Sequence, residues 1–173
     1  AGTNPKSVTS NDFDFDGNLD LAVGSGSTNG FNVSILRGDG MGSFQAPSNL
    51  YIINPSSITS SDFNHDGRPD LATTHSGSNK VSISLSVDYT LQGPFNFPTD
   101  SGPSSVTSSD FNHDGNPDLA VVNGINNISI FLNTTCPAIS SSSSSSSSSG
   151  PTITSSSSGT PLHICKQESN RFG

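Results

Sequence analysis

The stretch that decides the fold runs from Val106 to Val121 and reads VTSSDFNHDGNPDLAV. Its centre is a nine-residue acidic loop, Asp-x-Asp/Asn-x-Asp-Gly-x-x-Asp, set between two short runs of β-forming residues. The loop occurs three times in the 173-residue chain, at spacings of 50 and 48 residues. Its acidic and amide side chains are Asp12, Asp14, Asp16 and Asp20; Asp62, Asn64, Asp66 and Asp70; Asp110, Asn112, Asp114 and Asp118. Three evenly spaced copies indicate a tandem-repeat protein.

The loops predict up to three Ca²⁺ sites, because side-chain oxygens at positions 1, 3 and 5 converge on one point and Ca²⁺ prefers about six to eight oxygen ligands. Position 9 would add the last carboxylate, and the glycine at position 6 allows a sharp turn. Position 7 would add a backbone carbonyl, from Asn18, Arg68 and Asn116. An Asp-Gly turn without metal is the alternative, but carboxylates this close repel one another without a cation. With four carboxylates, we expect the first loop to bind most tightly.

The loops do not belong to EF-hands. An EF-hand needs an acidic residue at position 12 and a helix on each side. Position 12 is occupied by Val23, Thr73 and Val121, and the flanking residues are β-formers.

Each loop lies between two predicted strands. A Pro-x-Ser-Val/Ile-Thr-Ser strand precedes it, at residues 5–10, 55–60 and 103–108, and a Leu-Ala strand follows. A third run alternates apolar and polar residues, as in a half-buried strand. A fourth element appears in the first two copies but not in the third. We therefore predict an all-β fold of about three four-stranded antiparallel blades, each of about 50 residues, over residues 1–135.

Charge and composition exclude several classes of function. Ten of the fourteen acidic residues lie in the loops, so three Ca²⁺ would reduce the net charge from −8 to about −2. The six Lys and Arg residues form no basic patch, so we expect no nucleic-acid partner. No apolar run is long enough to span a membrane. The start at Ala1 fits a removed signal peptide or an upstream truncation.

Catalysis and zinc binding are not expected, because no activated nucleophile stands out and the acidic residues are assigned to metal. His65 and His113 occupy loop position 4, where we expect solvated side chains. His75 and His163 have no partners at zinc-ligand spacing.

Residues 136–173 differ in composition and are predicted to form an extended serine-rich tail, glycosylated or docked on a neighbour. Cys136 and Cys165 flank this tail and could form a disulfide, with free thiols as the alternative. Possible N-glycosylation sites are Asn32, Asn127 and Asn133. Possible O-glycosylation sites in the serine run include Ser140, Ser141, Ser142, Ser143, Ser144 and Ser145.

Residues 106–121 resemble the FG-GAP or VCBS repeat family, and so does the Gly-Asp-Gly-x-Gly-x-Phe turn at residues 38–44. The resemblance covers residues 1 to about 135. It implies blades of the β-propeller type, like those of integrin α-chain heads, with Ca²⁺ held by the loop aspartates on one rim. About three blades are too few to close a propeller ring, so the resemblance implies an incomplete ring. It also implies an extracellular or cell-surface location.

The open array of blades leads to our functional expectation, since unpaired sheet edges either aggregate or are used. We expect a secreted structural subunit that assembles head to tail with copies of itself into a fibre or surface array. The third blade lacks its fourth strand, which a neighbour's tail would supply. The alternative is a calcium-dependent adhesion or lectin-like module for glycans or matrix proteins, with aromatics on one rim drawn from Tyr51, Tyr89, Phe95 and Phe97. A non-catalytic domain of a larger surface enzyme is a third possibility.

Overall fold

The computed structural model describes residues 3–26, 33–87, 90–124, 126–134, 152–153, 162–167 and 170–171. Within these ranges the chain forms strands, turns and loops and no helix, as the sequence predicts. The strands are β1 (Pro5–Asn11), β2 (Asp20–Ser25), β3 (Val33–Leu36), β4 (Ser48–Leu50), β5 (Ser57–Ser61), β6 (Asp70–His75), β7 (Lys80–Val87), β8 (Thr90–Pro98), β9 (Ser105–Ser109), β10 (Asp118–Asn123), β11 (Asn127–Asn133), β12 (Thr152–Ile153), β13 (Leu162–Lys166) and β14 (Asn170–Arg171).

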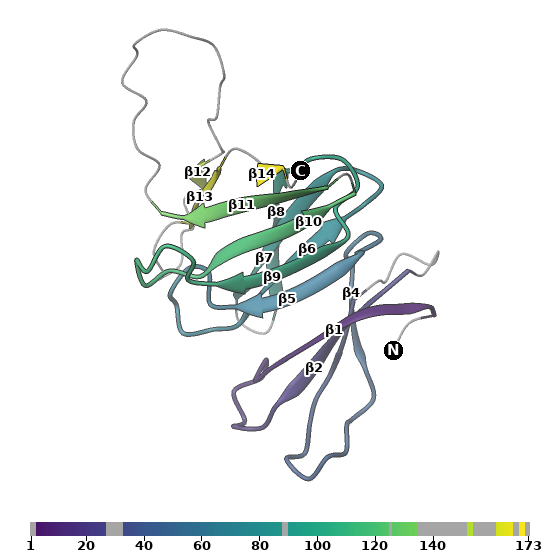
Figure 1. Ribbon diagram of the computed structural model, residues 1–173. Coiled ribbons are helices and arrows are strands. Elements are labelled where there is room, and N and C mark those ends of the chain that lie inside the picture. Colours follow the sequence, from purple (N-terminus) through teal and green to yellow (C-terminus); the bar gives the residue numbers. More distant parts are fainter. Residues whose placement is uncertain are drawn as a thin grey trace, which may run out of the picture.

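The strands form three antiparallel sheets, which we call blades (Figure 1). Blade 1 has the order β1-β2-β3-β4 and blade 2 the order β5-β6-β7-β8. Blade 3 has the order β9-β10-β11-β13, with β12 added beside β13 and β14 paired to β11. The first strands lie next to one another, since β1 contacts β5 and β5 contacts β9. In the described residues no sheet closes on itself, which confirms the predicted incomplete propeller.

Register gives every blade two distinct faces, because residues opposite each other in a ladder point to the same side. We call the face toward the next blade in sequence the trailing face, and the opposite one the leading face. In blade 1, Thr9, Ala22 and Ile35 are in register and lie on the trailing face. In blade 2, Ile58 and Thr73 are in register on the leading face, and Leu71 is two residues along the same side. The apolar side chains on the trailing face of blade 1 thus pack against those on the leading face of blade 2.

Two apolar cores fill the junctions between blades. The core between blades 1 and 2 contains the buried residues Ala22, Val33, Ile52, Ile58 and Leu71. The core between blades 2 and 3 contains the buried residues Phe63, Ala72, Val81, Ile83, Leu85, Phe97, Val106, Leu119, Val121, Phe131 and Ile164. Stability is therefore distributed over blade-to-blade contacts, as in other repeat proteins.

The fourth strand of blade 3 corrects one expectation from the sequence. That position is filled by β13 of the same chain, with Leu132 opposite Cys165 and Asn133 opposite Ile164. Ile164 is 1% exposed within the core, and the Lys166 ammonium lies 2.8 Å from Asp100 Oδ1. A neighbour's tail is thus not needed to complete the blade. The third copy seemed to lack a strand because its strand lies beyond the serine-rich segment.

Candidate metal centres

The three acidic loops have the same backbone conformation. Each connects the first and second strands of its blade, and each has two residues in the left-handed region, at positions 4 and 6. Position 4 has φ of 62°, 55° and 60° at Phe15, His65 and His113. Position 6 is a glycine with φ of 87°, 83° and 87° at Gly17, Gly67 and Gly115. The glycine avoids the strain that a side chain would bring at such angles.

Local hydrogen bonds fold each loop around its acidic side chains. The position-6 amide donates to the position-1 carboxylate at 2.9 Å in all three copies: Gly17 to Asp12, Gly67 to Asp62 and Gly115 to Asp110. The position-7 amide donates to the position-5 carboxylate at 2.8–2.9 Å: Asn18 to Asp16, Arg68 to Asp66 and Asn116 to Asp114. These bonds hold the side chains at positions 1 and 5 in fixed orientations.

The first loop brings three carboxylates together. One oxygen from each of Asp12, Asp14 and Asp20 lies within 4.8 Å of the others. Asp12 Oδ1 is buried and has no hydrogen-bond partner. Such an atom is costly unless a cation or a donor meets it. The donor set is all oxygen and negatively charged, so this loop fits a hard divalent cation such as Ca²⁺.

The second and third loops replace one carboxylate by an amide. Asn64 Nδ2 donates to Asp66 Oδ2 at 3.1 Å, and Asn112 Nδ2 donates to Asp114 Oδ2 at 2.9 Å. The amide oxygens accept from the backbone, Asn64 Oδ1 from the Asp66 amide and Asn112 Oδ1 from the Asp114 amide. In the described residues, a cluster of three acidic ligand atoms forms in the first loop only. The first loop differs because its position 3 is Asp14, whereas the other two loops have Asn64 and Asn112 there.

The position-9 aspartates have a structural role that the sequence does not reveal. Asp20, Asp70 and Asp118 are all 0% exposed. In each, Oδ2 accepts from the position-2 amide at 2.9 Å: Phe13, Phe63 and Phe111. In each, Oδ1 accepts from an amide at or beyond the third strand: Gly38 at 2.8 Å, Ser86 at 2.8 Å and Asn133 at 2.9 Å. One carboxylate therefore joins the loop to another segment of its blade.

Burial makes the central position-9 carboxylate costly to ionise. It raises the pKa of Asp70 to about 7, and the nearby Asp66 and Asp62 carboxylates act in the same direction. The amide bonds from Ser86 and Phe63 oppose this shift. In the exposed third loop, the backbone amide of Asn116 lowers the pKa of Asp114.

Neighbouring loops contact each other through positions 4 and 7. The Arg68 guanidinium lies 5.8 Å from the centre of the Phe15 ring. At the next junction, His65 Nε2 lies 2.7 Å from Asn116 Oδ1. Position 4 of one loop thus meets position 7 of the following loop at both junctions. The expectation that the histidines at position 4 are solvated missed this, because each contact joins residues about 50 positions apart in the chain.

The other predicted site residues have different outcomes. Asn133 is 6% exposed, and its Nδ2 donates to the Phe63 carbonyl at 2.7 Å, so burial disfavours the predicted glycan there. Asn127 is half-buried and bonded to Asp100, and its glycosylation stays a prediction. Cys165 is disulfide-bonded. The remaining predictions lie outside the described residues: Asn32, Cys136 and the serine run at 140–145.

The described aromatics among those expected for a glycan-binding rim do not gather at the surface. Phe97 is 2% exposed in the core and Phe95 packs against it, whereas Tyr51 is 66% exposed. Tyr89 lies outside the described residues. Phe97 therefore cannot belong to such a rim.

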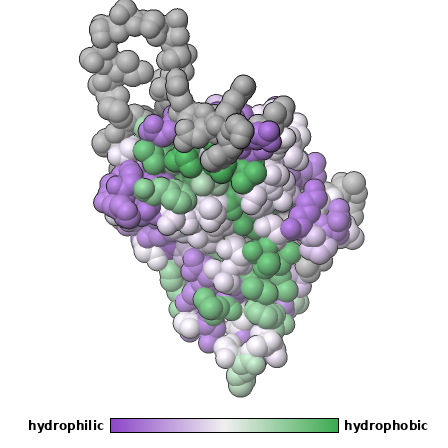
Figure 2. Space-filling model, viewed as in Figure 1, coloured by the Kyte–Doolittle hydropathy of each residue, from purple (hydrophilic) through white to green (hydrophobic). Residues whose placement is uncertain are grey.

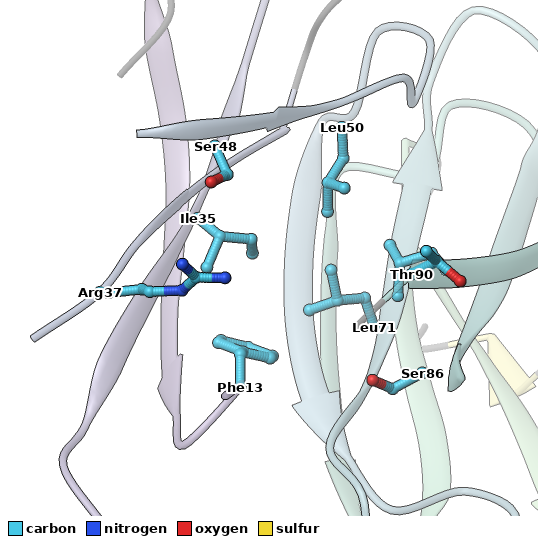
Figure 3. A pocket seen from close by; sticks show the side chains of 9 residues that line it. Phe13, Ile35, Arg37, Ser48, Leu50, Leu71, Ser86 and Thr90 are labelled. Atoms are coloured by element: carbon cyan, nitrogen blue, oxygen red, sulfur yellow. The ribbon is translucent and has the colours of Figure 1, made fainter. Parts of the chain in front are cut away.

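A cavity of about 80 Å³ lies between blades 1 and 2 (Figure 3). Phe13, Ile35 and Leu50 of blade 1 and Leu71 of blade 2 surround it, with Arg37 at its side. Its lining is mostly the apolar surface of the junction. It is a packing gap in the junction that reaches the first acidic loop at Phe13.

Comparison with known families agrees with this geometry. A family model described as the FG-GAP-like repeat matches residues 12–73 and 62–121. The chain belongs to the FG-GAP-like repeat family. Each match begins at position 1 of an acidic loop and ends on the second strand of the next blade. No curated protein matches the chain. In the described residues, no helix is long and apolar enough to cross a membrane.

Proposed function

We propose that this FG-GAP-like chain is a secreted, calcium-stabilised structural protein whose blades assemble head to tail with further copies into an extracellular fibre or surface array. The observation that carries the proposal is the open array. In the part of the chain that the structure describes, apolar side chains remain exposed on blades 1 and 3, among them Val8 and Val122. Proteins seldom leave such faces free without a partner.

Calcium would act as a structural ion in this proposal. Asp12, Asp14, Asp16 and Asp20 and their equivalents would hold it, together with carbonyls at position 7. Each loop connects the first two strands of a blade, so a bound ion would fix their register. The contacts of Phe15 with Arg68 and of His65 with Asn116 would connect each metal-bound loop to the loop of the next blade and so help to position that blade.

Assembly can be measured directly on the whole chain. Light scattering and electron microscopy of the protein in Ca²⁺ should show oligomers that lengthen with concentration. Particles of one chain at every concentration, in Ca²⁺ and in chelator, would contradict the structural proposal.

One observation favours a second candidate, a lectin-like or adhesion role. A cavity of about 390 Å³ lies between the first acidic loop and the turn at residues 38–44. Asn18, Asp39 and Phe44 line it, and Phe44 is 44% exposed. Polar side chains beside an exposed ring suit a sugar. Binding to a glycan array that Asp39→Ala abolishes, by a chain that stays monomeric, would favour this candidate over a fibre.

A further inference from the structure

The outer faces of blades 1 and 3 have the same residues that build the two internal junctions. On the leading face, Val8 corresponds to Ile58 and Val106. Ile58 and Val106 are 4% and 7% exposed against the preceding blade, whereas Val8 is 59% exposed. Leu21 likewise is half-buried, whereas its equivalents Leu71 and Leu119 are 1% and 0% exposed. The leading face of blade 1 is therefore a junction surface that no other described blade covers.

The trailing face of blade 3 repeats this pattern at the other end of the array (Figure 1). Phe111 is 44% exposed, but its equivalent Phe63 is 1% exposed in a junction. Ala120 is half-buried, whereas Ala22 and Ala72 are 0% exposed. Val122 is 43% exposed on the same face. Figure 2 shows apolar side chains gathered over β10 and β11 on the viewed side.

The polar contacts of the internal junctions also have equivalents at the ends. Ser7 Oγ accepts from the Ile58 amide at 3.1 Å, and Ser57 Oγ accepts from the Val106 amide at 3.3 Å. The next members of this series are Ser105, which is exposed, and the Val8 amide. The contacts between loops form a similar series. Its next pair would be His113 at position 4 of the third loop and Asn18 at position 7 of the first loop.

From these equivalences we infer that the trailing face of blade 3 binds the leading face of blade 1 of a second copy, forming a third junction like the two inside the chain. This inference rests on the proposed assembly and names its surfaces. Ser105 accepts from the Val8 amide of the next copy, and His113 meets its Asn18. The contact is heterologous, so one copy can bind a neighbour at each end.

A second copy of the chain is a suitable partner for the exposed end faces, because the trailing face has the same residue types in all three blades. Thr, Ala and Ile recur in register: Thr9, Ala22 and Ile35; Thr59, Ala72 and Ile83; Thr107, Ala120 and Ile130. Within the chain, this set of Thr, Ala and Ile packs against a leading face twice, once at each internal junction. Blade 3 of a second copy presents it again.

Two half-blocked variants test the inference. Val8→Asp places a charge on the leading face and Val122→Asp places one on the trailing face, both at exposed positions. Each variant alone should be monomeric by sedimentation, and an equimolar mixture should form a dimer with one chain of each kind and nothing longer. Met41→Asp, at an 87% exposed site on the turn at residues 38–44, should assemble like the wild type.

Other outcomes separate the two proposals. If the wild type assembles and Val8→Asp assembles equally well, the inferred faces are wrong while the structural function stands. If each variant still dimerises alone, the faces bind their own kind, which also overturns the inference. A wild type that never assembles defeats the proposed function itself. Should an Asp variant unfold, Ser10→Arg and Thr107→Arg replace exposed polar residues on the same two faces and must give the same mixing result.

Discussion

Replacing Asp118 by Asn tests whether the position-9 aspartate holds the blade together independently of metal. Asp118 accepts one hydrogen bond from the Phe111 amide and one from the Asn133 amide, both at 2.9 Å, and is 0% exposed. An Asn side chain has one acceptor oxygen, so its NH₂ group must face one of the two amides.

The expected cost follows from that geometry. One bond to a charged acceptor, about 1.5 to 3 kcal/mol, is lost and a buried amide is left unsatisfied, about 1 to 3 kcal/mol. Since the terms overlap, we expect the free energy of unfolding to fall by about 2 to 5 kcal/mol. The assay is urea unfolding at neutral pH in excess chelator, where metal binding contributes nothing.

The matched control is Asp114→Asn, which removes the same charge from an exposed position of the same loop. It should change the free energy of unfolding by less than about 1 kcal/mol in chelator. If Asp118→Asn is as stable as the wild type in chelator and differs only in Ca²⁺, the residue is a ligand alone and the reasoning is refuted.

Three further predictions concern the junctions and pH. Leu71→Ala should lower the free energy of unfolding by about 2 to 5 kcal/mol, because it opens a cavity in a junction. Leu21→Ala, at the equivalent half-buried site of blade 1, should lower the free energy of unfolding by less than about 1 kcal/mol when the chain is monomeric. Equal losses for the two variants would show that Leu21 is not an uncovered equivalent of Leu71. A double-mutant cycle of Phe15→Ala and Arg68→Ala in urea unfolding should give a coupling of about 0.5 to 1 kcal/mol, and additive effects would remove this contact between loops. Burial of His75, followed by the charge of Lys80, lowers its pKa, although the bond to the Ile53 carbonyl opposes the shift. The neutral form is thus favoured on folding, and stability should be full above the unfolded pKa of about 6.5 and decline as pH falls below it. His75→Gln should reduce this slope in urea unfolding across that range, and an unchanged slope would assign it to other groups.

Much of the fold could be predicted from the sequence because its signals are local. The alternation around Val33 and Ile35, and the same pattern at Val81 and Ile83, predicts half-buried strands. The structure has strands β3 and β7 there, but β7 is buried on both faces because a neighbouring blade covers each side. The glycine at position 6 and the spacing of Asp12, Asp14 and Asp16 predict a turn around converging oxygens. The structure has that turn, and its converging carboxylates are those of Asp12, Asp14 and Asp20. Each of these patterns lies within one short segment.

The features that sequence analysis missed depend on distant segments. β13 joins blade 3 across about 30 residues, and its Leu162 and Ile164 form too short an alternation to reveal a strand. The second partner of Asp118 is the Asn133 amide, whose position is set by the sheet. Comparing positions 4 and 7 between successive loops could have signalled their contact, since Phe15 with Arg68 and His65 with Asn116 are each complementary pairs.

We propose that the three acidic loops are calcium sites that stabilise the blades. Equilibrium dialysis combined with thermal unfolding tests it on the full chain. We predict three Ca²⁺ per chain and a melting temperature that falls in chelator. At a free Ca²⁺ concentration of 100 times the Kd, each site adds about 2.7 kcal/mol to the free energy of unfolding. Asp12→Ala should reduce the number bound to two. A chain that binds no Ca²⁺ and melts at the same temperature in chelator would contradict the account.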